Sequence, residues 1–87
     1  MITIYKYELQ VVDEQEIEMY DEYKLLSVIE QNGKIVVYAL INTDSNPRYN
    51  VKFIMRGTGH NAEKAANLTF LGTVKLLNGL LIYHIFY

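Results

Sequence analysis

The fold is decided at residues 24–42, which read KLLSVIEQNGKIVVYALIN. Two runs rich in apolar and β-branched residues flank Asn32-Gly33, and this dipeptide between such runs is the strongest short signal of a β-hairpin. A type I′ turn needs positive φ at both central positions, which asparagine and glycine tolerate. We therefore expect a tight hairpin in which Gln31 pairs with Lys34.

Strand 34–42 is apolar at nearly every position, so we expect both of its faces to be covered. Further strand patterns occur at 2–9, 49–56, 69–77 and 80–87. In segment 49–56 the alternation places Val51, Phe53 and Met55 on one side, opposite Lys52, Ile54 and Arg56. Gly72 indicates a bulge or a close crossing of chains. Asn78-Gly79 predicts a second hairpin, and Asn61 is placed to cap a short helix at 62–66.

Segment 13–22 holds six acidic residues and two readings of it stay open. Ile17 and Met19 alternate with Glu16 and Glu18, which indicates a short, half-exposed edge strand. A helix is the alternative, because the acidic residues at its start are typical of a helix N-terminus.

These elements predict a mainly β protein of about seven strands and one short helix, folded as one domain over residues 1–87. An antiparallel meander closed into a small sandwich or an open barrel fits this pattern. The chain contains no cysteine, so neither disulfides nor thiolate metal sites can stabilise it. Small domains without such crosslinks often gain stability by oligomerising.

Charge is distributed unevenly along the chain, although the net charge is only −2. Residues 1–44 carry nine acids and three lysines, whereas residues 45–87 carry one acid and five bases. The small net charge argues against general nucleic-acid binding. The asymmetry leaves two readings open: an acidic and a basic face on one body, or ordinary solvated strand faces.

The last strand is apolar on both sides, with Tyr83, Ile85 and Tyr87 on one and Ile82, His84 and Phe86 on the other. Either this strand is central in a sandwich or one side meets another subunit. We predict a homo-oligomer with Tyr83, Ile85 and Tyr87 at the interface. For His84 we expect a core histidine with satisfied hydrogen bonds.

The loop Arg56-Gly57-Thr58-Gly59-His60-Asn61 is the best candidate for a ligand site. Its glycines let backbone N–H groups converge on an anion such as phosphate, and Arg56, Thr58 and His60 add side-chain donors. We predict that Arg56, Thr58, Gly59 and His60 bind the ligand and that Tyr38 or Tyr49 stacks on a base. The alternative is a turn that simply requires glycine.

No catalytic centre, metal site or cofactor is predicted. The only histidines, His60 and His84, lack a carboxylate at ligand spacing, and neither Ser27 nor Ser45 stands in a nucleophile motif. The beginning of the chain lacks the pattern of a signal peptide, and no apolar run approaches the ~18 residues of a membrane span. We therefore expect a cytoplasmic protein.

Several motifs carry a family resemblance: Tyr5-Lys6-Tyr7-Glu8-Leu9, residues 13–19, Gln31-Asn32-Gly33-Lys34, Gly57-Thr58-Gly59-His60, Leu71-Gly72-Thr73, Gly79 and His84-Ile85-Phe86. Through them the chain resembles small uncharacterised proteins encoded by bacteriophages and prophages. It departs from their pattern at Tyr20, Tyr38 and Asn61. The resemblance implies a phage accessory protein that acts in the host bacterial cytoplasm, where such proteins commonly blunt host defence by binding.

Three hypotheses follow. The first is an oligomeric sponge that sequesters a nucleotide-derived immune signal, such as a cyclic dinucleotide or cyclic ADP-ribose. The second is a protein-binding inhibitor of a host enzyme, which acts through the acidic segment 13–22. The third is a structural virion component, which rests only on the apolar last strand.

Overall fold

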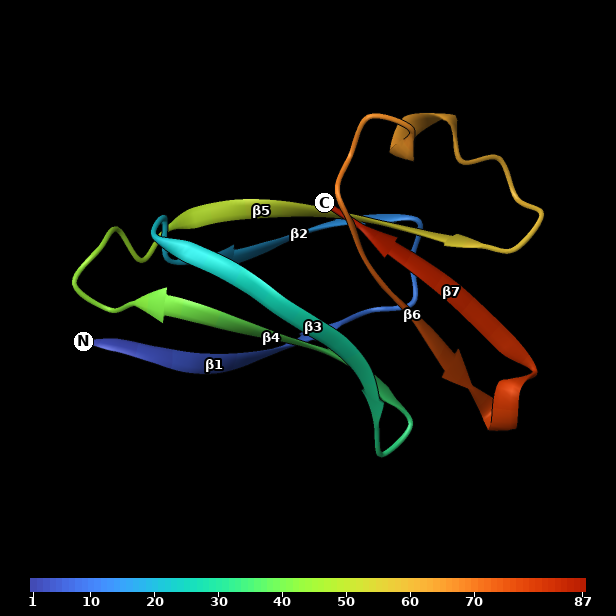
Figure 1. Ribbon diagram of the computed structural model, residues 1–87, viewed down its shortest axis with the longest axis horizontal. Coiled ribbons are helices and arrows are strands. Elements are labelled where there is room, and N and C mark those ends of the chain that lie inside the picture. Colours follow the sequence, from blue (N-terminus) through green and yellow to red (C-terminus); the bar gives the residue numbers. More distant parts are fainter.

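Seven antiparallel strands in two sheets make up most of the protein (Figure 1), and the computed structural model describes all 87 residues. The strands are β1 (Ile2–Leu9), β2 (Glu14–Met19), β3 (Tyr23–Gln31), β4 (Lys34–Asn42), β5 (Tyr49–Gly57), β6 (Phe70–Leu76) and β7 (Leu81–Phe86). One sheet has the order β1-β4-β3 and the other β2-β5-β7-β6. The predicted β class is confirmed, and of the architectures left open the structure adopts the sandwich.

The hairpin from β3 to β4 forms as predicted. Gln31 pairs with Lys34, and Asn32 and Gly33 have φ of 54° and 81°, the positive values that a type I′ turn requires. Segment 13–22 contains the edge strand β2 rather than a helix. Apart from β6 and β7, the other paired strands are not consecutive in sequence, since β1 pairs with β4, β2 with β5, and β5 with β7. The strand order is therefore not that of the simple meander that we expected.

The core lies between the two sheets and is entirely apolar. All 17 buried residues are hydrophobic, and no buried side-chain nitrogen or oxygen lacks a hydrogen-bond partner. Alternate residues of three strands supply its centre: Ile35, Val37, Ala39 and Ile41 from β4, Val51, Phe53 and Met55 from β5, and Ile85 from β7. The predicted division of segment 49–56 into an apolar and a mixed side is thus confirmed.

The expectation that both faces of β4 are covered is only half right. Its inner residues are buried, and Val36 on the outer side is 5% exposed. Tyr38 and Leu40 on that outer side are only half-buried, because no element of the chain lies over this face. Only neighbouring side chains of the same sheet cover the outer side of β4.

The last strand owes its two apolar sides to its central position, since β7 lies between β5 and β6. Ile85 has no exposed surface, and Tyr83 and Tyr87 pack against the same core. The predicted interface of Tyr83, Ile85 and Tyr87 is therefore wrong as a free surface, because the chain's own core occupies that side. On the other side Phe86 contacts Phe70, with ring centroids 5.5 Å apart.

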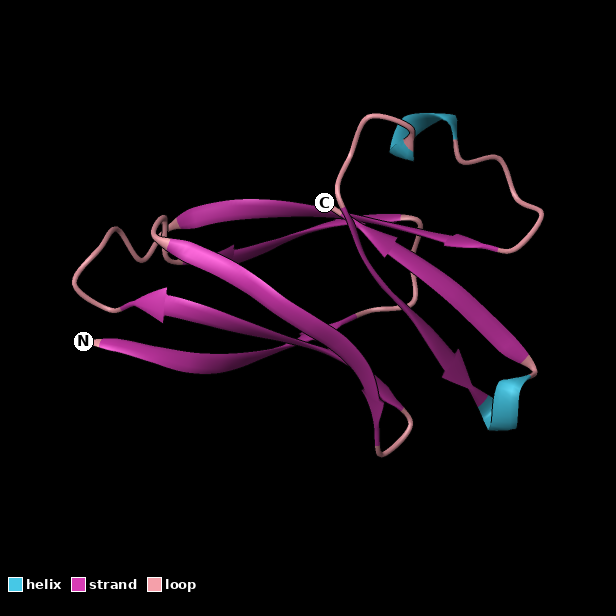
Figure 2. Cartoon of the chain, viewed as in Figure 1, coloured by secondary structure: helices cyan, strands magenta, loops and turns pink.

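The predicted helix at 62–66 is wrong in type and length, because only a 3₁₀ turn forms, η1 (Glu63–Ala65). A helix of five residues cannot repay the cost of its nucleation. The predicted cap is also wrong in position, because Ala62 is the N-cap of the turn. Asn61 lies one residue earlier, where its Oδ1 accepts a hydrogen bond from the Glu63 N–H at 3.0 Å. Figure 2 shows this turn in the long loop after β5 and a second, η2 (Leu77–Gly79), at the tip of the β6–β7 hairpin.

The second predicted hairpin forms with a longer connection than Asn78-Gly79 alone would give. Leu76 pairs with Leu81, and Leu77, Asn78 and Gly79 all have positive φ. Neither 3₁₀ turn approaches the length of a membrane-spanning helix.

Gly72 lies both at a bulge and at a close crossing of chains, which are the two features that a glycine within a strand indicated. The β6–β7 register shifts between Phe70 and Gly72, which marks a bulge. A Cβ on Gly72 would lie 2.8 Å from Cγ1 of Val28 in β3 of the facing sheet. Only glycine therefore allows β6 to approach β3 this closely.

Gly72→Ala is expected to destabilise the protein by about 1–3 kcal/mol, the usual cost of overpacking a core. In a Val28→Ala background the obstructing methyl group is gone, so the same substitution should be neutral or slightly stabilising. Urea denaturation of the four proteins in this cycle measures both costs. An equal cost in both backgrounds would contradict the role given to this contact.

Candidate functional site around His60

The segment Gly57-Thr58-Gly59-His60 is a tight β-turn at the end of β5. The His60 N–H donates to the Gly57 carbonyl at 3.1 Å, and Gly59 has a φ of +86°, as the third residue of a type II turn requires. A Cβ on Gly57 would lie 2.9 Å from the ring of His60. The turn therefore needs Gly59 for its positive φ, and it needs Gly57 so that the imidazole of His60 can lie over that residue.

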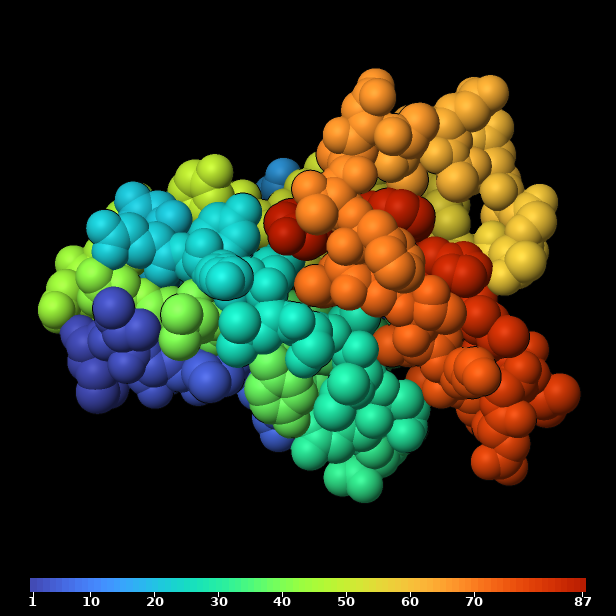
Figure 3. All heavy atoms as spheres, in the orientation of Figure 1, coloured from blue at the N-terminus to red at the C-terminus, as the bar shows by residue number.

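Three surface depressions adjoin His60. The largest, about 510 Å³, is lined only by polar residues: Asp13, Arg56, His60, Asn61, Glu63 and Lys64. A second of about 190 Å³ is lined by Val11, Val12, Asp13, Met55, Gly57, His60 and Tyr83, and a third of about 270 Å³ runs toward Leu80 and Leu81. In the space-filling view, the yellow-to-orange segment after β5 stands away from the rest of the molecule (Figure 3). We call the depression of about 510 Å³ the polar depression and the depression of about 190 Å³ the apolar depression.

Arg56 is engaged with the protein's own backbone. Its Nε donates to the Asn61 carbonyl, and its Nη1 donates to the carbonyls of Asp13 and Met55, each at 2.9 Å. These bonds tie the loop after β5 to the connection between β1 and β2. Arg56 was predicted as a phosphate ligand, but the structure uses most of its donors to position the walls of the polar depression.

Thr58 is also occupied, by His84. Thr58 Oγ1 lies 2.8 Å from Nε2 of His84, and Thr73 Oγ1 lies 2.9 Å from Nδ1 of the same ring. His84 is thus satisfied at both nitrogens, as one reading predicted, but it lies on the outer side of its sheet and not in the core. These pairings leave His60 as the exposed imidazole of the region.

The structure does not bring Tyr38 or Tyr49 to this loop. Tyr38 lies on the outer face of the other sheet, where its hydroxyl donates to Gln31 Oε1 at 2.8 Å. Tyr49 begins β5 at the opposite end from Gly57, and its ring lies 5.9 Å from that of Tyr23. The predicted grouping of these two tyrosines with the glycine turn is therefore wrong, because sequence does not tell which sheet or strand end a residue will occupy.

Six residues that line the two depressions were not predicted as site residues: Val11, Val12, Asp13, Met55, Glu63 and Lys64. Lys64 stands only four residues after His60, so the sequence alone indicates that the two residues lie near each other. Val11 and Val12 are apolar, lie between strands, and are 51% and 46% exposed. The sequence feature that could have indicated Val11 and Val12 is an apolar pair in a predicted loop.

Glu14 forms the charged margin of the site, between two lysines. Its carboxylate oxygens lie 2.9 Å from Lys52 Nζ and 3.2 Å from Lys64 Nζ. Hydrogen bonds from Lys52 and then Lys64, with their charges, lower the pKa of Glu14 from 4.5 to about 2. At this point the acidic half of the sequence meets the basic half, and one carboxylate lies between two lysines.

The pKa of Glu14 should return toward 4.5 in the double variant Lys52→Met/Lys64→Met, and carboxyl NMR titration measures it directly. Because the folded pKa is depressed, the stabilisation is present above the unfolded pKa near 4.5 and is lost as the pH falls toward about 2. Lys75→Met, an exposed lysine on β6, is the matched control and should leave the titration unchanged. An unaltered Glu14 pKa in the double variant would contradict the assignment.

Comparison with known proteins gives a family but no chemistry. No curated protein and no solved structure matched the chain. A family model described as Domain of unknown function (DUF7352) matches residues 1–87, which is the whole sequence. The chain belongs to this DUF7352 family.

Proposed function

We propose that this protein acts by binding, without catalysis, and that the two depressions beside His60 receive a nucleotide-type small molecule. One observation carries the proposal: a fully polar depression and one lined mainly by apolar residues share His60 and Asp13 in their walls. A nucleotide has the same division, with a charged phosphate at one end and a flat base at the other. The larger depression, about 510 Å³, lies in the usual size range of ligand pockets.

The polar depression supplies the phosphate side of this match. His60 and Lys64 line it. In the adjoining turn, the backbone N–H groups of Thr58 and Gly59 make no hydrogen bond within the protein, although neither residue lines the depression itself. Turns with free N–H groups commonly bind anions. Asp13 and Glu63 lie in the same depression, so a ligand that also carries donors, such as ribose hydroxyls, fits it better than inorganic phosphate does.

The apolar depression supplies the base side. Val11, Val12, Met55 and Tyr83 give it aliphatic and aromatic surface. Tyr83 packs partly against the core, and we assign to its exposed part the stacking role that was predicted for Tyr38 or Tyr49. Aromatic side chains are well suited to stacking on a base.

The resemblance to phage and prophage proteins suggests the biological setting. In this setting the ligand is a nucleotide-derived immune signal, and the protein is a sponge that removes it in the host cytoplasm. Self-association into a homo-oligomer belongs to the same proposal, because a chain of 87 residues without disulfides has a small core. Native mass spectrometry of protein from infected cells would report both the oligomer and any retained small molecule.

Isothermal titration calorimetry tests the proposal with cyclic di-GMP, cyclic GMP-AMP, cyclic ADP-ribose and inorganic phosphate. We expect binding of at least one nucleotide and little or none of phosphate. His60→Ala and Lys64→Met should each weaken binding by about tenfold, the loss of one hydrogen bond to a charged group.

Two further variants separate the site from general effects. Gly57→Ala should weaken binding by displacing the His60 ring, which lies where the new Cβ would be. Lys75→Met removes the same charge as Lys64→Met but lies outside the depressions, so it should bind normally. No heat with any nucleotide would reject the proposal.

A second candidate function is a protein-binding inhibitor that uses the acidic strand β2. This strand lies at the edge of its sheet and exposes Glu16 and Glu18. Glu14 is paired with lysines of its own chain, so the two exposed glutamates are the groups left for a basic partner. Edge strands can also pair with a strand of another protein.

Charge reversal tests this second function. Glu16→Lys/Glu18→Lys should abolish the recovery of a partner from host lysate, while Glu63→Lys, an exposed acid outside β2, should leave it intact. Equal recovery by wild type and the double variant would count against the inhibitor. Detection of the protein in purified virions would instead support the structural role.

A further inference from the structure

We infer that the outer face of the three-stranded sheet docks a protein segment that presents apolar side chains beside carboxylates. The strand register places six apolar residues on this face: Ile2, Ile4, Ile29, Val36, Tyr38 and Leu40. Ile2, Ile4 and Ile29 are 68%, 56% and 42% exposed. Single exposed apolar residues are ordinary, but a continuous group on one sheet face marks an interaction site.

The charges on this face point to an acidic partner. Residues 1–44 contain only three bases, Lys6, Lys24 and Lys34, and the register places all three on this face. Lys34 pairs with Glu8 at 3.4 Å, whereas Lys6 and Lys24 form no salt bridge. The acidic half of the chain thus presents a basic, apolar surface, and complementary charge selects its partner.

The shape of the face favours a protein segment as its partner. A depression of about 250 Å³ lies at one end, with Ile2 and Leu40 in its lining and Lys24 and Glu22 beside them. Glu22 already accepts a hydrogen bond from Asn42 Nδ2 at 2.6 Å. Such a depression can receive one apolar side chain with Lys24 next to it, as a protein segment with apolar and acidic residues would present.

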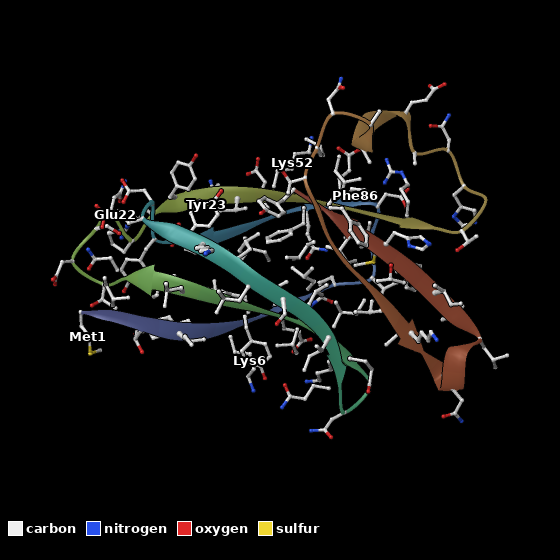
Figure 4. All side chains as sticks on the ribbon, in the orientation of Figure 1. Met1, Lys6, Glu22, Tyr23, Lys52 and Phe86 are labelled. Carbon is white, nitrogen blue, oxygen red and sulfur yellow. The ribbon has the colours of Figure 1, made fainter.

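A second copy of this chain is also a poor occupant. A two-fold dimer through this face would bring together two copies of a surface on which lysines outnumber carboxylates, so like charge would oppose the association. In Figure 4, Lys6 points away from the body of the molecule, and Met1 and Glu22 mark the strand ends that bound this sheet. The unpaired lysines are therefore free to meet carboxylates of a different protein.

Binding to defined peptides tests the inference. The probes are a peptide of alternating leucine and glutamate and its counterpart with lysine in place of glutamate, measured by fluorescence anisotropy and by ¹⁵N NMR shift mapping. The acidic peptide should bind about tenfold or more tightly than the basic one, weaken with added salt, and shift amides of β1, β3 and β4. Equal binding of both peptides, or shifts confined to β5–β7, would overturn the inference.

Matched variants give the second measurement. Lys6→Glu/Lys24→Glu should reduce acidic-peptide binding by about tenfold or more, since each charge pair is reversed. Lys75→Glu/Lys52→Glu makes the same charge change on the other sheet and should have a much smaller effect. Circular dichroism and thermal melting confirm that each variant is folded, and nucleotide binding beside His60 should be unaffected by Lys6→Glu/Lys24→Glu.

Two other outcomes would replace the acidic partner with a different occupant. Sedimentation of a dimer that Lys24→Glu dissociates would identify a second copy. Binding to phosphatidylglycerol vesicles without binding of the acidic peptide would identify a membrane. Either result would overturn the inference.

Discussion

The structure depends on the apolar contact between the inner faces of the two sheets. A sheet of three or four short strands is stable only when one face is covered, and here each sheet covers the other. Residues of both sheets form one apolar cluster, with Val37, Phe53 and Ile85 among its most deeply buried members. Since no polar side chain is buried, this core imposes packing but no hydrogen-bonding pattern.

The core also determines where the candidate site lies. Because Phe53 and Met55 point inward, Arg56 emerges on the outer side of β5, and Gly57 falls at the end of the strand. Arg56 then holds both connections that form the polar depression, through the carbonyls of Asp13 and Asn61. The multiple donors that make arginine a good phosphate ligand here make it an intramolecular brace.

The two outer faces differ because the chain covers only one of them. On the four-stranded sheet, Ile54 is buried on the outer side of β5, Ala65 of the following loop is buried too, and Lys64 reaches Glu14 of β2. On the three-stranded sheet no loop returns over β4, so Leu40 and its neighbours remain accessible. Function through binding is consistent with this arrangement, in which one face is built up by a loop and the other is left open.

The sequence by itself determined the local features. Strand positions, the Asn32-Gly33 turn and the inward alternation of Val51, Phe53 and Met55 all follow from backbone sterics and the two-residue period of strands. These constraints act within a few residues, so they can be inferred without knowing the fold.

Only the tertiary structure decided which strands became neighbours. Pairing of β1 with β4, β2 with β5, and β5 with β7 joins segments far apart in sequence, and periodicity says which residues share a face but not what that face meets. For the same reason the sequence did not show that Tyr38 lies far from the glycine turn or that Ile85 lies in the core. It also did not show that Arg56 donates its hydrogen bonds to backbone carbonyls of its own chain. Those outcomes depend on the total burial achieved by the whole chain, which no single segment specifies.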